Sequence, residues 1–330
     1  MAELKVGIVG LGKMGFLHAS ILNVIPNVEI VALCDKSSVL LKIAKKLFKK
    51  AKIAKDIEKL ADLNINTLYI TTPIPSHYSI LKNVFSTNLV HNLFVEKTLT
   101  SNWVESNELC KIAEICTKTN MVGYMKRFGV TFAKAKQQLL KGKIGKLISF
   151  TAYAYSSDFL TMKQGSNKSM IRGGVLSDLG SHIIDLAIWY FGNFKVNSAK
   201  LDSINHINFE DSANFEVENS KLKGLFHISW CMDNYRMPAF GLRIKGTSGS
   251  LNVSDYSLEL KLKNKKSSIW YKQDLNDSVD FLLGDSEYYR ENEFFVESIL
   301  KGKKVEPSFE TASKVDYLID QVRQKGDNDE

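Results

Sequence analysis

Short apolar runs alternate with amphipathic stretches along the first third of the chain. Runs rich in β-branched residues predict strands at 5–10, 28–34, 67–71 and 92–95. Apolar residues at helical spacing predict helices at 13–25, 37–50, 76–86 and 101–118. Strands that alternate with helices are typical of parallel pairing, because a parallel neighbour is reached through a crossover helix. The pattern therefore predicts a doubly wound α/β domain over 1–122.

The pattern changes after Val122. A long helix is predicted over 174–191, and strand-like runs follow at 215–218, 224–230, 242–245 and 250–253. A turn at 246–249 joins the last two runs, and short turns indicate antiparallel pairing. The remainder, 123–330, is therefore predicted to be an α+β domain with a mostly antiparallel sheet. Two further helices, 287–300 and 310–324, and a polar tail at 326–330 complete the chain.

Composition narrows the class of protein. The chain is 44% hydrophobic and 24% charged, as globular proteins are, and no apolar run approaches the roughly 18 residues of a membrane span. Its start leads directly into the first strand, without the pattern of a secretory signal. The cysteines have no zinc-site spacing and suit free thiols in a reducing compartment; they are Cys34, Cys110, Cys116 and Cys231. We therefore expect a cytoplasmic protein with no membrane partner and no metal.

The net charge of +8 raises the question of a nucleic-acid partner. The excess is almost all lysine, and its densest part, 42–59, interleaves lysines with apolar residues at roughly helical spacing. Such a pattern is typical of the solvated face of an amphipathic helix. A nucleic-acid surface would need a basic patch interleaved with aromatic residues, which the sequence lacks. We therefore expect no nucleic-acid partner.

A glycine motif lies between the first predicted strand and the first predicted helix. Gly10, Gly12 and Gly15 form G-x-G-x-x-G, with Lys13 and Met14 at the start of the helix. One glycine permits the tight turn, one permits close approach of a pyrophosphate, and one permits close packing of helix and strand. The N–H groups at the start of the helix then face the phosphate charge. Glycine-rich turns also occur without ligands, so the motif gains weight only from its context.

Asp35 supplies that context, because it ends the second strand 20 residues after Gly15. A carboxylate there can accept hydrogen bonds from ribose hydroxyls. It also repels the 2′-phosphate of NADP, so NAD is favoured as the cofactor. NADP stays open as an alternative, because Lys36, Ser37 and Ser38 could hold a phosphate if Asp35 turned away.

Two further segments follow predicted strands, where ligands of doubly wound sheets bind. Thr72, Pro73 and His77 follow the strand that ends near residue 70, and Glu96 and Lys97 follow the strand that ends at residue 95. A lysine after a strand is often only a surface cation. Lys97, however, leaves a short and very apolar strand toward the expected cofactor crevice, so we assign it a functional role.

Asp178 and His182 are four residues apart, which places them on one face of the predicted helix 174–191. A carboxylate beside an imidazole fixes its tautomer and raises its basicity, as general-base chemistry near neutral pH requires. A purely structural Asp–His pair stays open as an alternative.

These segments together resemble the Gfo/Idh/MocA oxidoreductase family. The resemblance rests on the glycine motif, on Glu96-Lys97-Thr98 and on Gly173-Gly174-x-x-x-Asp178-x-x-x-His182-x-x-Asp185. The segments 72–77, 123–128 and 246–249 also look like parts of the family. The resemblance spans essentially the whole chain and implies an N-terminal Rossmann domain followed by a domain with an open sheet. That sheet often forms the oligomer interface in the family, so a homodimer or homotetramer is expected.

The resemblance also implies roles for individual residues. Lys97 matches the lysine of the family's E-K-P motif, Asp178 the dyad aspartate and His182 the acid/base histidine. Two positions depart from the family pattern: Thr98 stands where proline is usual, and Arg172 stands where a third glycine is common. Lys97, Asp178 and His182 are the expected catalytic residues. The expected cofactor ligands are Gly10, Gly12, Lys13, Met14, Gly15, Asp35, Thr72, Pro73, His77, Glu96 and Lys97. Position suggests further substrate contacts by Tyr124, Arg127, Tyr155, Arg172 and Asp185, the last with a structural role as the alternative.

The implied activity is hydride transfer between a nicotinamide cofactor and a hydroxyl-bearing carbon of a sugar, sugar derivative or polyol. Two other interpretations stay open. One is an NAD-dependent glycoside hydrolase or epimerase in which oxidation is transient. The other is a nucleotide-binding regulatory protein without turnover, although a sensor would need none of Lys97, Asp178 and His182.

Overall fold

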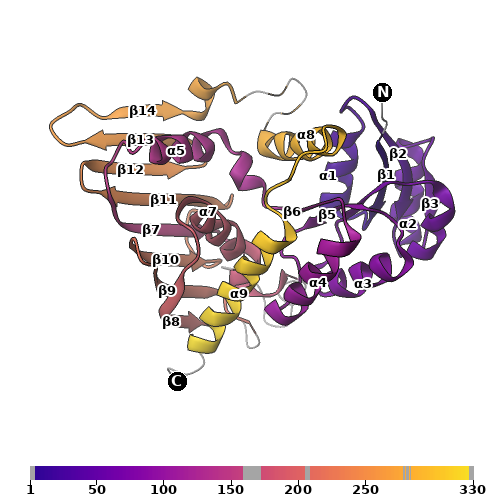
Figure 1. Cartoon of the computed structure of the whole chain (residues 1–330), viewed down its shortest axis with the longest axis horizontal. Helices are drawn as coiled ribbons and strands as arrows, with labels where there is room; N and C mark the ends of the chain where they lie inside the picture. The colour runs from indigo at the N-terminus through magenta and orange to yellow at the C-terminus, as the bar shows by residue number, and fades with distance from the viewer. Residues whose placement is uncertain are drawn as a thin grey trace. The chain divides into compact units, whose positions relative to one another are not determined.

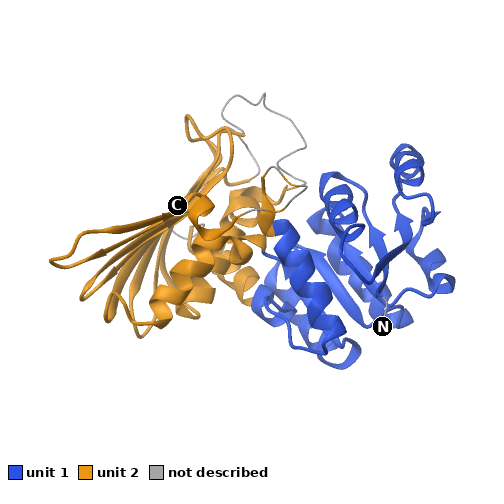
Figure 2. Ribbon diagram, turned by 90° about the horizontal axis from the view of Figure 1, so that it is seen from above, with its two compact units in different colours: residues 1–124, 288–313 blue, residues 125–287, 314–330 orange. Residues whose placement is uncertain are grey.

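The computed structural model describes residues 4–158, 172–204, 209–277, 279, 282 and 284–326. The chain forms two compact units (Figure 2): Met1–Tyr124 with Tyr288–Ser313, and Met125–Glu287 with Lys314–Glu330. This division differs from the predicted domains 1–122 and 123–330, because a late segment returns to the first unit. Most of the predicted polar tail, 327–330, lies outside the described residues.

The first unit contains a six-stranded, wholly parallel sheet in the order β3-β2-β1-β4-β5-β6 (Figure 1). This is the strand order of a Rossmann fold, and it confirms the predicted doubly wound sheet. The pattern did not predict β3 and β6, which are short and carry few apolar residues. The strands are β1 Leu4–Val9, β2 Val28–Cys34, β3 Lys52–Ala54, β4 Thr67–Ile70, β5 Asn92–Glu96 and β6 Thr119–Gly123.

An aromatic cluster explains why the late segment belongs to the first unit. Tyr69 of β4 stacks on Phe94 of β5 with ring centroids 4.6 Å apart. Phe295 of α8 packs edge-on against both rings, at 5.7 and 5.6 Å. All three side chains are fully buried, so α8 completes the core. The helices concerned are α1 Lys13–Leu22, α2 Ser38–Leu47, α3 His77–Thr87, α4 Trp103–Cys116 and α8 Ser286–Leu300, with short 3₁₀ turns η1 Ile57–Leu63 and η2 Ile74–Ser76.

The second unit contains an eight-stranded sheet in the order β14-β13-β12-β11-β7-β10-β9-β8. Among its pairs of neighbouring strands, β7 and β10 run parallel and the others antiparallel, which confirms the predicted mostly antiparallel sheet. The strands are β7 Leu147–Tyr155, β8 Lys195–Asp202, β9 Ser212–Glu218, β10 Lys223–Ser229, β11 Ala239–Gly246, β12 Gly249–Ser254, β13 Ser257–Leu262 and β14 Ser268–Tyr271.

Helices of the second unit lie against one face of this sheet (Figure 1). Along β7, Phe150, Ala152 and Ala154 are buried under that face, whereas Tyr153 and Tyr155 point the other way and are half-exposed. The helical elements are η3 Met125–Phe128, α5 Val130–Leu140, the π-helical turn η4 Leu176–Gly180, α7 Ser181–Phe191, η5 Lys272–Leu275 and α9 Phe309–Gly326. No helix in the described ranges combines the length and apolarity needed to cross a membrane.

Candidate functional site

The glycine motif lies between β1 and α1, and its three glycines have different surroundings. Gly10 has a φ of +94°, and a Cβ there would lie 2.7 Å from the backbone nitrogen of Thr72. A Cβ at Gly15 would overlap the carbonyl oxygen of Gly10. At Gly12, by contrast, a Cβ would meet nothing within 4 Å, and φ is an ordinary −69°. Within the described residues, close contacts therefore require glycine at positions 10 and 15. No such contact explains Gly12, and its open surroundings suit a ligand-binding position.

The start of α1 adds an electrostatic reason for an anionic ligand at Gly12. Gly12 is the N-cap residue, it makes no side-chain cap, and the first turn of α1 contains no acidic residue. Its N–H groups and the positive end of the helix dipole are thus available to a phosphate. Lys13 is exposed and Met14 half-exposed at the same turn. The loop fits the pyrophosphate of a dinucleotide.

Asp35 is held by backbone groups from two loops. Its carboxylate oxygens accept hydrogen bonds from Leu11 N, at 2.6 Å, and from Ser37 N, at 2.7 Å. Ser37 in turn caps α2 by accepting from Leu40 N. These bonds fix the carboxylate beside the glycine motif, and each oxygen keeps a further lone pair for a ribose hydroxyl.

The Thr72 and Lys97 loops are connected through a buried histidine. The ring nitrogens of His77 lie 2.8 Å from the carbonyl oxygen of Thr72 and 3.0 Å from that of Thr98. Burial lowers the pKa of His77, although the two carbonyls oppose the shift. Pro73 is exposed beside this connection. His77 thus connects the Thr72 loop to the Lys97 loop.

Glu96 is turned into the core of the first unit. It accepts from Nε2 of His18 at 2.7 Å, and Nδ1 of His18 lies 3.0 Å from Oδ1 of Asn292 in α8. The other Glu96 oxygen accepts from the backbone N–H of Lys97 at 3.3 Å. This arrangement favours a role for Glu96 in holding the Lys97 loop. His18 was not predicted, because a single histidine on a buried helix face gives no signal in sequence.

The predicted helix 174–191 is present, but its first full turn is π-helical. Asp178 lies in η4 and His182 in the first turn of α7. π-Helical turns are rare and are often found at functional sites. His182 is 5% exposed and packs edge-on against Phe240, with centroids 5.6 Å apart. Asp178 accepts a hydrogen bond from Arg172 at 3.1 Å, and the same Arg172 nitrogen bonds Asp158 at 2.9 Å.

A buried lysine that the sequence analysis did not single out lies near this helix. Lys126 is buried and pairs with Asp255 at 2.6 Å and Glu287 at 3.1 Å, and its amino group lies 5.0 Å from the centroid of the Phe240 ring. Burial alone would lower the pKa of Lys126, but the two carboxylates raise it above the ordinary lysine value. Lys126 therefore stays charged behind the aromatic ring that contacts His182.

Four of the predicted substrate residues have partners or surroundings within the protein. Arg127 and Asp185 form a buried two-pronged ion pair with N–O distances of 2.7 and 2.6 Å. Tyr124 is fully buried at the end of β6. Tyr155 stacks on Tyr153 on the face of the sheet opposite α7, with centroids 5.2 Å apart. The geometry favours Arg172, Asp178 and His182 over these residues as substrate contacts.

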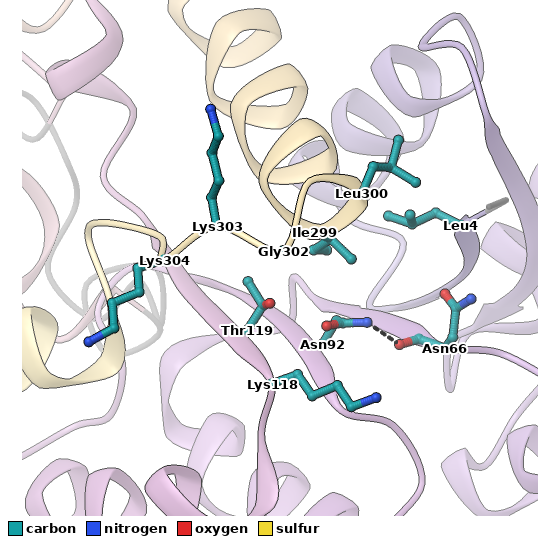
Figure 3. A pocket seen from close by; sticks show the side chains of 10 residues that line it. All are labelled: Leu4, Asn66, Asn92, Lys118, Thr119, Ile299, Leu300, Gly302, Lys303 and Lys304. Carbon is teal, nitrogen blue, oxygen red and sulfur yellow. Dashed lines mark hydrogen bonds between the residues drawn. The ribbon is translucent and has the colours of Figure 1, made fainter. Parts of the chain in front are cut away.

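A pocket of about 500 Å³ in the first unit is not the candidate site (Figure 3). It lies at the amino ends of β1, β4, β5 and β6, whereas the glycine motif, Asp35 and Lys97 follow the carboxyl ends. Its lysines, Lys118, Lys303 and Lys304, spread their amino groups apart rather than toward one point (Figure 3). Among the described residues, no three His, Cys, Asp or Glu side chains are grouped as metal ligands.

Comparison with known proteins gives the family. Residues 4–124 match the model of the oxidoreductase family with an NAD-binding Rossmann fold, and residues 132–252 match that of the GFO/IDH/MocA C-terminal domain. The two matches cover more than half of the chain. The chain therefore belongs to the Gfo/Idh/MocA family, and its first unit matches the family's NAD-binding Rossmann fold.

Two curated relatives illustrate the family. The scyllo-inositol 2-dehydrogenase (NAD(+)) of Bacillus subtilis is 26% identical over 195 residues, which cover 58% of this chain and 54% of the relative. The myo-inositol 2-dehydrogenase of Thermotoga maritima is 23% identical over 192 residues, covering 57% and 55%. The chain thus matches a little over half the length of these relatives.

Solved structures share the fold over nearly the whole chain. A levoglucosan dehydrogenase in complex with NADH and levoglucosan has a TM-score of 0.88 at 20% identity, covering 99% of this chain and 98% of its own. An oxidoreductase from Agrobacterium radiobacter in complex with NAD+, L-tartaric acid and magnesium has a TM-score of 0.86 at 18% identity, covering 100% and 98%. At these identities the likeness shows the fold.

The open space at Gly12 gives the first testable prediction. Gly12→Val should weaken NADH binding by roughly 100-fold or more, because the side chain would occupy the path of the pyrophosphate. The melting temperature should not change, since the backbone conformation suits valine and no neighbour is displaced. Gly284→Val is the matched control, because Gly284 also has nothing within 4 Å. Calorimetric titration with NADH measures both, and normal affinity in Gly12→Val would refute the assignment.

The Arg127–Asp185 pair gives the second prediction. Asp185→Asn should lower the free energy of unfolding by about 3–5 kcal/mol, because it leaves the buried guanidinium without its carboxylate. The double variant Arg127→Met/Asp185→Leu should lose less than the sum of the single variants. Urea unfolding measures these values. If the residues were instead substrate ligands, KM would rise while stability stayed constant.

Proposed function

We propose that the protein catalyses reversible hydride transfer between NAD and a hydroxyl-bearing carbon of a sugar, sugar derivative or polyol. The observation that carries the proposal is the placement of Asp178 and His182 on consecutive turns at a π-helical helix start. The inositol dehydrogenases among the relatives, and the levoglucosan bound in the similar structure, support hydroxylated ring substrates.

In the oxidation direction, His182 takes the proton of the reacting hydroxyl. Asp178 stabilises the imidazolium that develops, and Lys97 donates a hydrogen bond to the reacting oxygen and stabilises its growing negative charge. NAD, when bound, accepts the hydride that leaves the same carbon. The proton and the hydride together account for the two hydrogens lost by the alcohol.

The carboxylates beside Arg172 support a hydroxylated substrate. Arg172 pairs with both Asp158 and Asp178. Each carboxylate oxygen has more than one lone pair, so both groups can still accept hydrogen bonds from substrate hydroxyl groups.

We also propose that NAD is preferred over NADP. The alternative requires Asp35 to turn away, yet two backbone N–H groups hold its carboxylate and Ser37 caps α2. The carboxylate thus stays where it would repel a 2′-phosphate.

The oligomeric state belongs to the proposal as well. The face of the eight-stranded sheet opposite α7 carries Tyr153 and Tyr155, and Tyr235 from the connection between β10 and β11 packs on Tyr155; the ring centroids are 5.2 and 5.3 Å apart along this series. Half-exposed tyrosines are common in protein interfaces. We propose that this face forms a homodimer or homotetramer.

The cofactor preference gives the third prediction. Asp35→Ser should raise the affinity for NADPH relative to NADH by roughly 10-fold or more, because the repulsion of the 2′-phosphate is lost. Asp56→Ser, which removes an exposed carboxylate after β3, is the control. Fluorescence titration with each cofactor measures the ratio. An unchanged ratio in Asp35→Ser would place selectivity in the segment 36–38.

The catalytic assignment gives the fourth prediction. Lys97→Met and His182→Ala should each lower kcat by roughly 10²–10⁴, the usual contribution of oxyanion and general-base groups. Asp178→Asn should also lower kcat strongly. The pH profile of kcat/KM should lose its limb near neutral pH in His182→Ala. NADH affinity should stay within a few-fold of the wild type in His182→Ala and Asp178→Asn, because neither residue is an expected cofactor ligand.

A panel of sugars, inositols and nucleotide sugars, assayed for net NADH formation, identifies the substrate on which these rates are measured. Lys118→Met and His91→Ala remove the same side chains from exposed positions and serve as controls. Wild-type turnover in Lys97→Met and His182→Ala would overturn the assignment. Product without net NADH would favour a hydrolase or epimerase.

A further inference from the structure

The helix that carries Asp178 and His182 begins at an unusual turn. Gly173 and Gly174 have φ angles of +72° and +84°, and the π-helical turn η4 follows immediately. A Cβ at Gly174 would overlap the carboxylate of Glu210, a residue 36 positions further along the chain. The glycine is therefore required by a close contact inside the second unit, and Glu210 lies directly on the helix start.

Glu210 satisfies the first N–H groups of this helix start. Its backbone carbonyl accepts from Val175 N at 2.9 Å, and its side-chain oxygen Oε1 accepts from Leu176 N at 3.3 Å. Helix starts are usually capped by a residue directly before the helix. Here the cap comes from a remote segment, and the Glu210 carboxylate is only 9% exposed.

Arg323, near the end of α9, completes the arrangement. Its Nη2 donates to the carbonyl oxygen of Gly173 at 2.6 Å, to Ser177 Oγ at 3.1 Å and to Glu210 Oε1 at 2.8 Å. The ion pair balances the charge of the buried carboxylate. The same nitrogen thus contacts both the glycine turn and the residue that precedes Asp178.

We propose that Arg323 and Glu210 are positioning residues that hold the start of the Asp178–His182 helix in its π-helical register. The inference rests on the proposed function, because the helix start that Arg323 and Glu210 hold carries Asp178 and His182, the residues proposed to act on the substrate. Without the contacts made by Arg323 and Glu210, the turn at Gly173 and Gly174 and the following η4 are free to rearrange. A displacement of about 1 Å in a catalytic group can cost roughly 100-fold in rate. A buried ion pair alone would stabilise the fold without favouring one register.

The test compares Arg323→Gln with Arg323→Lys and Lys325→Gln. Arg323→Gln should lower kcat by roughly 10–100-fold, with KM and NADH affinity within about 3-fold of the wild type. Arg323→Lys should recover most of the rate, because an ammonium can donate from one nitrogen to the same three oxygens. Lys325→Gln removes an equal charge from an exposed position in the same helical turn and should change neither parameter.

Hydrogen–deuterium exchange gives a readout that needs no substrate. Backbone amides of 175–182 should exchange faster in Arg323→Gln, and those of the first unit should not. Wild-type kcat or unchanged exchange in 175–182 would overturn the proposal. Faster exchange throughout the protein with weakened NADH binding would show a general structural role and overturn it too. If the wild type oxidises no substrate in the panel, the proposed function fails. Hydrogen–deuterium exchange still tests whether Arg323 and Glu210 hold the start of the Asp178–His182 helix.

Discussion

The backbone N–H groups at two helix starts determine what each unit can do. At α1, Gly12 provides no side-chain cap, and among the described residues no atom lies within 4 Å of where a Cβ of residue 12 would be. At the start of the Asp178–His182 helix, Glu210 accepts from Val175 and Leu176. The first helix start thus has the surroundings that suit an anion, whereas the second has two of its N–H groups satisfied by Glu210.

Two carboxylates of the first unit fix loops that follow its strands. Asp35 connects the glycine loop to the start of α2, and Glu96 connects the Lys97 loop to His18 in α1. Each carboxylate lies where its charge is partly removed from water, so its hydrogen bonds to N–H groups are strong and directional. Loops held in this way keep their shape without help from a ligand, which reduces the ordering cost of binding.

The sequence predicted the features that depend on local pattern. Periodicity located most of the helices and strands, and the predicted glycine motif and Asp35 lie side by side, joined by a hydrogen bond from Leu11 N to Asp35. The sequence could not predict ion pairs whose members are distant along the chain, such as Arg127–Asp185 or Arg323–Glu210. No motif around either residue of such a pair indicates which partner it contacts. The face on which Tyr155 lies could not be predicted either, because strand alternation places it opposite α7 only once β7 is in register with β10 and β11.

The distribution of charge in the second unit limits which ligands it can accept. Lys126, Arg127, Arg172 and Arg323 are all paired with carboxylates, and the first two pairs are buried. The lysines of α2, by contrast, are exposed and contribute to the net charge of +8. Within this unit Asp178 pairs with Arg172, and His182 packs on the buried ring of Phe240. Under the proposed function, hydroxyl groups of the substrate can donate to the carboxylate and to the imidazole.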